Sequence, residues 1–339
     1  MKASIKDVAK LAGVSQACVS KFLNNKPYVS KKTKEKIQKA IDELNYRPSA
    51  IARSLVTKKS KNIGIIVLDI TNPYQTETIR GIEEYKTIHN LDYNILLIDM
   101  ATKEGSGDKY IDVLLENRVA GIATTSDKIS PQYVRFLNKI SIPTIFIGRV
   151  VDVPEIEIDF VTVDNEKGAY GMTNYLLGLG HRKIFYFTGP LDTNVTSQRL
   201  KGYKKALREF EGGRLKPEVI DSGDFTYEAG YKTAEQIFSS TNRPSAIFCA
   251  NDYSAFGVID YCYKHGVKIP DDVSVAGFDD VAFSSFGFIS LTTVRQPIKK
   301  LGILAAESLF KKIIDGTEEP IQIVLKPEIV IRRSTKTLK

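Results

Sequence analysis

Residues 4–24 read SIKDVAKLAGVSQACVSKFLN, which is the pattern of two short helices joined by a tight turn. Ser4 can cap the first helix, with Asp7 at the third helical position as in a capping box. Gly13 suits a turn that needs a positive φ, and Ser15 can cap the second helix. The buried side of the first helix is expected to consist of Ile5, Val8, Ala9 and Leu11. The stretch therefore predicts a helix-turn-helix, whose second helix enters the major groove of DNA.

The second helix would present a polar outer face made of Gln16, Ala17, Ser20, Lys21 and Asn24. Gln can hydrogen-bond adenine, Lys can reach guanine or a phosphate, and Ala17 can contact only a thymine methyl group. A third helix is expected to start at Ser30, where the hydroxyls of Ser30 and Thr33 suit a phosphate oxygen. A small helical bundle that binds protein is the alternative interpretation of this head.

Residues 46–55 read YRPSAIARSL and are expected to add a second DNA contact. Pro48 can open a helix over residues 49–56, which is too short to be stable alone, so DNA and a partner chain would have to order it. Leu55, near the small Ala52, can serve as a wedge between base steps in the minor groove. An ordinary linker that contains a leucine is the competing interpretation.

The positive charge is confined to one end of the chain. The formal charge of the whole chain is +8. Residues 1–61 hold 13 Lys and 2 Arg against 4 acidic residues, a charge of +11, which leaves −3 for residues 62–339. A basic head on a mildly acidic body indicates a polyanionic partner for the head alone.

Motifs of the common enzyme classes are absent. The sequence has no GxSxG, Walker or HExxH pattern, and GLGH at 178–181 lacks the spacing of a dinucleotide-binding loop. We therefore expect no enzymatic activity, no cofactor and no metal. The scattered Cys18, Cys249 and Cys262 favour a reducing compartment. Without a secretory signal or an apolar run of roughly 18–20 residues, the expected protein is cytoplasmic and has no membrane partner.

Residues 62–339 alternate apolar strands with amphipathic helices, the βαβ signature of an α/β protein with parallel sheets. Helices are expected between the strands, for example at 75–89, 168–179 and 199–211. Two successive series of strands predict two similar lobes. The strands are expected at 62–69, 93–98, 121–124 and 144–147, then at 183–188, 219–222, 245–250 and 273–277, with further strands at 322–325 and 329–332.

Polar and aromatic residues follow several of these strands, at the edge where such sheets bind ligands. They are Asp69, Tyr74, Arg149, Phe225, Tyr227, the pair Asn251 and Asp252, and the pair Asp279 and Asp280. Arg199 is expected to open a helix after a long loop. Aromatic faces beside charged hydrogen-bonding groups suit a polyhydroxylated ring such as a sugar. Strand-end caps, surface charges or a salt bridge between the lobes, from Arg199 to Asp279, remain as alternatives.

The chain resembles the LacI/GalR family of bacterial transcription regulators over most of its length. The resemblance implies a helix-turn-helix domain at 1–46, a hinge helix and linker at 47–61, and a periplasmic-binding-protein-like body at 62–339. The body would consist of an N-lobe at about 62–160 and 291–320 and a C-lobe at about 161–290 and 321–339. The stretches that carry the resemblance are DVAKLAGVSQACVSKFLNN, VSKKTKEKI, LNYRPSAIARSL, VDNEKGA, GHRKIFYFTG, RLKGYKKAL, ANDYSAFG, IPDDVSVAGFDD and LTTVRQP.

The resemblance also implies roles for residues of the head and hinge. Gln16, Ala17 and Lys21 would read bases, and the DNA backbone would be contacted by Ser15, Ser20, Asn24, Ser30 and Thr33. The hinge contacts would be Tyr46, Ser49, Ala52 and Leu55, with Leu55 as the intercalating wedge. Members of this family usually have Arg where this chain has Lys21. Because Lys lacks the two-pronged geometry of Arg, the operator preference at that base step stays open.

In the body the resemblance favours Arg199, Asn251 and Asp279 most strongly as effector ligands, followed by Tyr74 and Arg149. It also implies that Gln296 binds the effector. Asp69 and Phe225 complete the expected effector-binding residues. The function expected is that of a homodimeric repressor that binds double-stranded operator DNA and responds to a small-molecule effector, with a sugar favoured. A phosphosugar, a nucleobase or a protein co-regulator are alternative effectors. A sugar-binding transport component and a sugar-processing enzyme are the alternatives from other functional classes.

Overall fold

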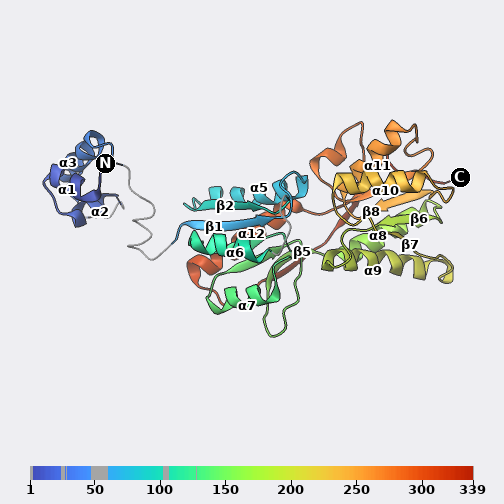
Figure 1. Cartoon of the computed structure of the whole chain (residues 1–339), viewed down its shortest axis with the longest axis horizontal. Coiled ribbons are helices and arrows are strands. Elements are labelled where there is room, and N and C mark those ends of the chain that lie inside the picture. The colour runs from blue at the N-terminus through green and yellow to red at the C-terminus, as the bar shows by residue number, and fades with distance from the viewer. Residues whose placement is uncertain are drawn as a thin grey trace. The chain divides into compact units, whose positions relative to one another are not determined.

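The computed structural model describes residues 3–23, 27, 29–46, 60–101, 107–126 and 128–338 (Figure 1). The chain divides into two compact units, Met1–Lys61 and Asn62–Lys339, and each has its own apolar core. The expected DNA contacts Asn24, Ser49, Ala52 and Leu55 lie outside the described residues. No helix in the described part of the chain is long and apolar enough to cross a membrane.

The head is built from the expected helices, and their ends match the capping signals. The backbone N–H and the hydroxyl of Ser4 both donate to the carboxylate of Asp7, at 2.8 and 2.7 Å. These hydrogen bonds lower the pKa of Asp7, because they favour its charged form. The helices are α1 (Ile5–Ala12), α2 (Gln16–Leu23) and α3 (Lys31–Glu43).

The core of the head takes one fully buried side chain from each helix: Val8, Val19 and Ile37. Leu11, expected inside, is 46% exposed. The buried positions of α1 follow the spacing i, i+3, i+4, i+7 from Ile5, which brings Ala12 into the core in place of Leu11. Gly13 ends α1 with a φ of 66°, the left-handed conformation expected of the turn.

The N-lobe contains a six-stranded parallel sheet with the strand order β11-β5-β4-β3-β1-β2. Its strands are β1 (Asn62–Val67), β2 (Asn94–Asp99), β3 (Ile122–Thr124), β4 (Thr144–Ile147), β5 (Asp159–Val163) and β11 (Gln322–Leu325). The helices of this lobe are α5 (Pro73–Ile88), α6 (Asp108–Glu116), α7 (Pro131–Lys139) and α12 (Ile298–Asp315). Helix α12 reaches this lobe from the far end of the sequence and packs beside α5 (Figure 1).

The C-lobe repeats the design with the strand order β12-β10-β9-β8-β6-β7. All neighbouring strands pair in parallel except β10 and β12, which pair antiparallel at the edge of the sheet. The strands are β6 (Ile184–Phe187), β7 (Glu218–Ile220), β8 (Ala246–Cys249), β9 (Ser274–Asp279), β10 (Thr292–Arg295) and β12 (Glu328–Val330). The helices are α8 (Asn165–Gly178), α9 (Asn194–Glu209), α10 (Tyr227–Phe238) and α11 (Asp252–Lys264), with short 3-10 turns η1 (Phe210–Gly212) and η2 (Ala282–Ser285).

The chain crosses between the lobes a few residues later than expected. Strand β5 runs to Val163 within the N-lobe sheet, β10 pairs with β9 in the C-lobe, and β11 pairs with β5. Residues 161–163 and 322–325 therefore belong to the N-lobe, and residues 292–295 belong to the C-lobe. The expected lobe boundaries at these places are wrong because each strand completes its hydrogen-bond ladder before the chain leaves the sheet. The crossings fall at 164, 296–297 and 326–327.

Candidate functional site

The outer side of α2 carries the three residues expected to read bases, Gln16, Ala17 and Lys21. Ser15, Gln16, Ala17 and Lys21 are exposed and Ser20 is half-buried, whereas Val19 on the opposite side is fully buried. The hydroxyl of Ser15 accepts a hydrogen bond from the backbone N–H of Cys18 at 3.2 Å and so caps the helix. The first turn of α2 therefore offers side chains of the kind that reach base edges in a major groove.

Ser30 and Thr33 lie together at the start of α3. The backbone N–H of Thr33 donates to the Ser30 hydroxyl at 3.3 Å, and the two hydroxyl oxygens are 2.8 Å apart. A helix N-terminus with hydroxyl groups is a suitable place for a phosphate oxygen. Tyr46, expected in the hinge, is half-buried and packs against the core of the head.

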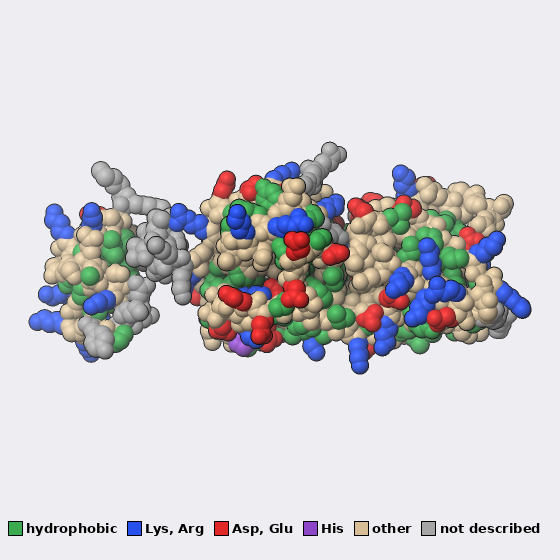
Figure 2. Space-filling model, turned by 90° about the horizontal axis from the view of Figure 1, so that it is seen from below, with side chains coloured by type: hydrophobic (Ala, Val, Ile, Leu, Met, Phe, Trp, Pro, Cys, Tyr) green, Lys and Arg blue, Asp and Glu red, His purple; other side chains and the backbone are tan. Residues whose placement is uncertain are grey.

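Lysine side chains are spread over the visible face of the head, whereas the visible face of the body carries both signs of charge (Figure 2). The exposed lysines among the described residues 3–46 are Lys6, Lys10, Lys21, Lys31, Lys32, Lys34, Lys36 and Lys39. A surface of this kind attracts the phosphate backbone of DNA regardless of sequence.

A cavity of about 500 Å³ lies between the two lobes, at the carboxyl ends of their parallel strands. All residues expected to bind the effector line it: Asp69, Tyr74, Arg149, Arg199, Phe225, Asn251, Asp279 and Gln296. They meet there because loops that follow parallel strands gather at one edge of each sheet. Tyr227, also expected near this edge, begins α10 and donates a hydrogen bond to Asp260 at 2.5 Å.

Arg199 is fixed within the C-lobe wall of the cavity. Its guanidinium carbon lies 3.7 Å from the centre of the Phe278 ring, and its Nε donates to the side-chain oxygen of Asn165 at 2.8 Å. A further nitrogen donates to the carbonyl of Ala250. Arg199 does not open a helix as expected, because α9 already begins at Asn194, after its cap Thr193.

Asp279 is 4% exposed and ends β9 with a φ of 136°. One of its carboxylate oxygens accepts a hydrogen bond from the side-chain amide of Gln296 at 2.6 Å and lies 3.8 Å from a guanidinium nitrogen of Arg199. Burial raises the pKa of Asp279, and this effect outweighs the opposing attraction of Arg199. Because both residues belong to the C-lobe, the alternative of a salt bridge between the lobes is wrong for this pair.

The N-lobe and the C-lobe meet where Arg149 approaches Phe225. The guanidinium carbon of Arg149 lies 5.8 Å from the ring centre of Phe225, and its Nε donates to the carbonyl of Thr125 at 2.5 Å. The amide nitrogen of Asn251 donates to the carbonyl of Phe225 at 2.9 Å, while its oxygen caps α11 by accepting from Ser254 at 3.0 Å. Asn251 therefore shapes the cavity wall by holding Phe225 in place.

Tyr74 and Asp69 shape the N-lobe wall. A methyl group added at Gly148, which has a φ of 71°, would lie 2.1 Å from the hydroxyl oxygen of Tyr74, so only glycine fits there. Burial and the nearby carboxyl of Asp279 raise the pKa of Tyr74, so this phenol is neutral and can donate a hydrogen bond. Asp69 accepts hydrogen bonds from the backbone and the hydroxyl of Thr71, at 2.8 and 2.6 Å.

Comparison with known proteins finds a matching family for each of the two units. Residues 4–49 match the family described as bacterial regulatory proteins of the lacI family, and residues 173–335 match a periplasmic binding protein-like domain. The transcriptional repressor PurR of Photobacterium profundum is 35% identical over 337 residues, which cover 99% of each chain. The chain belongs to the LacI family.

Solved structures of LacI-family proteins have the same fold. A Lac repressor dimer bound to operator is matched with a TM-score of 0.83 and 26% identity, over 99% of this chain and 100% of that one. A LacI-family regulator of Enterococcus faecium with bound ribose has a TM-score of 0.74 and 27% identity, over 82% and 100% of the two chains. This chain is therefore a DNA-binding repressor with an effector-binding domain, and the enzyme and transport interpretations are excluded.

The cavity of this LacI-family chain includes residues that the sequence analysis missed. Among them are Asn72, Gln75, Lys128, Thr193 and Asp224. Asn72 and Thr193 cap α5 and α9 directly after strand-end loops, a signal that was present in the sequence. Nothing local marks Lys128, which reaches the cavity only through the folding of its loop. No group of three or more His, Cys, Asp or Glu in the described part of the body or head is arranged to hold a metal.

Proposed function

We propose that this repressor is controlled by a sugar that binds between the lobes of its body. The cavity supports this proposal, because the guanidinium groups of Arg149 and Arg199, the carboxyl group of Asp279 and the ring of Phe225 line one space of about 500 Å³. Guanidinium and carboxyl groups hydrogen-bond to hydroxyls, and an aromatic face covers the apolar side of a sugar ring. The ribose bound to the Enterococcus faecium relative supports the same class of effector.

A nucleobase is the second candidate effector. The relationship to a PurR repressor favours it, and so does the combination of Phe225 and Tyr74 with donors and acceptors on several sides of the cavity. A planar heterocycle stacks on aromatic rings and hydrogen-bonds at its edges. The two candidates differ in whether a flat ring or a ring with axial and equatorial hydroxyls fits the space.

On the DNA side, we infer a homodimer in which two heads read a pseudo-palindromic operator, as the dimeric Lac repressor relative suggests. Gln16, Ala17 and Lys21 would read bases, and Ser15, Ser20, Asn24, Ser30 and Thr33 would contact the backbone. Tyr46, Ser49, Ala52 and Leu55 would make the hinge contacts, with Leu55 as the minor-groove wedge. An effector that prefers one arrangement of the lobes would change the spacing of the hinges, with a coupling of about 1–3 kcal/mol.

A thermal-shift titration of the purified chain with D-ribose, cellobiose and guanine tests the effector proposal. A ligand at a hundredfold excess over its dissociation constant stabilises the folded state by about 2.7 kcal/mol. We expect a sugar to raise the melting temperature of the wild-type chain in a concentration-dependent way, and to have little effect on Asp279→Ala. A shift with guanine alone would replace the sugar by a nucleobase. A shift in wild type that Asp279→Ala retains in full would remove the cavity from the effector assignment.

A further inference from the structure

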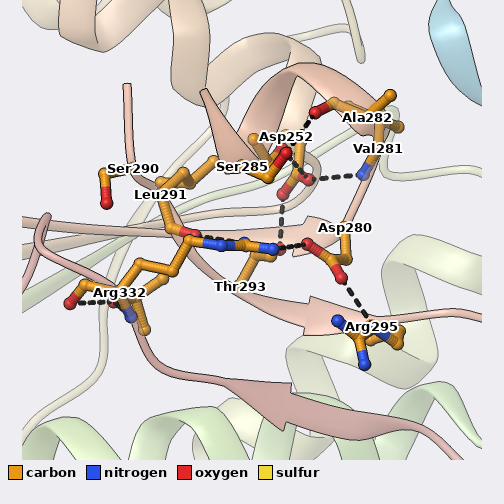
Figure 3. A network of polar contacts seen from close by, with 12 residues as sticks. Asp252, Asp280, Val281, Ala282, Ser285, Ser290, Leu291, Thr293, Arg295 and Arg332 are labelled. Atoms are coloured by element: carbon orange, nitrogen blue, oxygen red, sulfur yellow. Dashed lines mark hydrogen bonds and ion pairs between the residues drawn. The ribbon is translucent and has the colours of Figure 1, made fainter. Parts of the chain in front are cut away.

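Asp280, which follows Asp279, joins two arginines that come from distant parts of the chain. One carboxylate oxygen pairs with Nε of Arg295 at 2.6 Å, and the other pairs with a terminal nitrogen of Arg332 at 2.6 Å. Figure 3 shows the carboxylate of Asp280 between the two guanidinium groups. The side chains of Asp280 and Arg332 are 6% and 16% exposed, so their charge pair is little screened by water, whereas Arg295 is 47% exposed.

One of the two arginines stands directly before a place where the chain crosses between the lobes. Arg295 is the last residue of β10, directly before the crossing at 296–297. The chain enters β12 after the crossing at 326–327, and Arg332 follows the far end of that strand. There it donates to the carbonyl of Leu291 at 2.7 Å, beside the start of β10. A single carboxylate therefore joins the end of β10, at one crossing, to the chain beyond β12, the strand that follows another crossing.

The same point of the fold is tied to the effector cavity. The backbone N–H of Gln296 donates to the carbonyl of Asp279 at 3.0 Å, and the Gln296 side chain donates to the Asp279 carboxylate at 2.6 Å. Asp279 and Asp280 both have positive φ, 136° and 59°, which side-chain-bearing residues rarely adopt unless their surroundings hold them. The two ion pairs of Asp280, with Arg295 and Arg332, are called the clamp. The clamp holds the backbone that sets the orientation of the Asp279 carboxylate.

Asp252 braces the other side of this turn. Its buried carboxylate accepts hydrogen bonds from the hydroxyl of Thr293 at 2.5 Å and from the backbone N–H of Val281 at 3.1 Å (Figure 3). It also accepts a hydrogen bond from the hydroxyl of Ser284 at 2.5 Å. Thr293 belongs to β10, as does Arg295, so the turn after β9 is bonded to β10 on both sides. Movement of β10 at the crossing would therefore move Asp279 with it.

We propose that Asp280, clamped by Arg295 and Arg332, is a positioning residue that couples the lobe crossings to the effector cavity. In this arrangement a change in the angle between the lobes changes the orientation of the Asp279 carboxylate. Because coupling is reciprocal, a molecule bound to Asp279 also changes the angle that the lobes prefer. This inference rests on the proposed effector function, which places Asp279 in contact with the ligand. Asp280 itself need not touch the ligand.

The test compares Asp280→Asn with Asp159→Asn in the full chain. Asn tolerates positive φ as well as Asp does, so the first substitution removes the charge pairs without straining the backbone. Asp159 pairs with Lys312 at 2.8 Å with both side chains largely buried, but it begins β5, at the end of the strand away from the cavity. It is therefore a matched control for the loss of a buried ion pair.

Amide hydrogen exchange and binding are measured on both variants. We expect Asp280→Asn to exchange faster than wild type at 292–297 and 326–332, and Asp159→Asn to leave these segments unchanged. With D-ribose, cellobiose and guanine as probes, the dissociation constant of whichever binds wild type should rise at least tenfold in Asp280→Asn and less than twofold in Asp159→Asn. The same probe should also change the affinity for DNA selected from a random library, and this change should be smaller in Asp280→Asn than in wild type or Asp159→Asn.

Arg332→Met provides a second, independent variant. It should reproduce the exchange pattern of Asp280→Asn, and the double variant should add little, because both changes break the same clamp. Faster exchange spread evenly over the C-lobe would mean that Asp280 only stabilises the fold. The same conclusion would follow if Asp280→Asn left unchanged both the affinity for the probe and the effect of the probe on DNA affinity. A wild-type chain that binds none of the probes would overturn the proposed sugar and nucleobase effectors, while the exchange data would still decide whether the clamp holds the crossings.

Discussion

Asp279 shows how one residue of this repressor acquires unusual properties from its surroundings. Its position after β9 is visible in the sequence, but its burial, its hydrogen bond from Gln296 and its distance from Arg199 arise only in the fold. Asn251 shows the opposite outcome. It lines the cavity as expected, yet both ends of its amide serve to cap α11 and hold Phe225. For single residues, the sequence predicts which side chains lie at the ends of the strands, but it does not predict what each side chain contacts there.

The raised pKa of Asp279 predicts a pH effect on stability. Since the folded chain holds this proton more tightly than the unfolded chain, the free energy of unfolding falls as pH rises from the ordinary value of 3.8 through the raised pKa. Each unit by which the pKa is raised corresponds to about 1.4 kcal/mol. Asp279→Asn removes this contribution, so the variant should gain stability relative to wild type as pH rises through that window. Chemical denaturation between pH 4 and 8 measures the difference, and parallel pH profiles for the two proteins would contradict the burial argument.

Among the helices, the close packing of α5 against α12 depends on two glycines. A methyl group at Gly81 would lie 2.2 Å from the carbonyl oxygen of Lys299, and one at Gly302 would lie 2.1 Å from that of Thr78. The two helices are far apart in sequence, so periodicity alone could not pair them. The capping residues of the helices, by contrast, were readable in advance. Arg199 lies within α9 and not at its start, because Thr193 caps the helix and α9 begins at Asn194.

Gly302→Ala is expected to destabilise the N-lobe. Backbone atoms cannot move aside cheaply, so a cost of about 1–3 kcal/mol is expected from overpacking. The control is Gly178→Ala, which is at the end of α8 and has open space around the added methyl group. It should be neutral or stabilising by about 0.4–1 kcal/mol. Thermal or chemical denaturation separates the two, and equal stabilities would mean that α5 and α12 can shift apart.

For the whole molecule, DNA recognition and effector recognition are divided between the two compact units, Met1–Lys61 and Asn62–Lys339. The head carries the positive charge and the exposed polar side of α2, and the body carries the cavity. Three of the expected hinge contacts, Ser49, Ala52 and Leu55, lie outside the described residues. Substitutions in the two units should therefore have separable effects.

Leu55→Ala and Asp279→Ala test this division. Loss of the proposed wedge should weaken binding to the selected operator DNA by about tenfold or more, because unstacked base steps would lose their apolar partner. The affinity of the same variant for the effector should stay within about twofold of wild type, since mutations at distant, independent sites usually add. Asp279→Ala should show the reverse pattern. Fluorescence anisotropy and calorimetry measure the two affinities, and exchanged phenotypes would refute both site assignments.

The amino-acid sequence by itself determined the three-helix head, the alternation of strands and helices, and the edge of the sheets where the cavity lies. These features follow from capping residues, apolar periodicity and the order of elements, all of which act over short stretches of chain. Only the tertiary structure decided that β11 pairs with β5, with Gln322 opposite Phe160, and that Arg199 and Asp279 belong to the same lobe. It also brought Lys128 into the cavity and joined Arg295 and Arg332 through Asp280. Such contacts join residues far apart in the chain, and they depend on strand register and packing that no local pattern encodes.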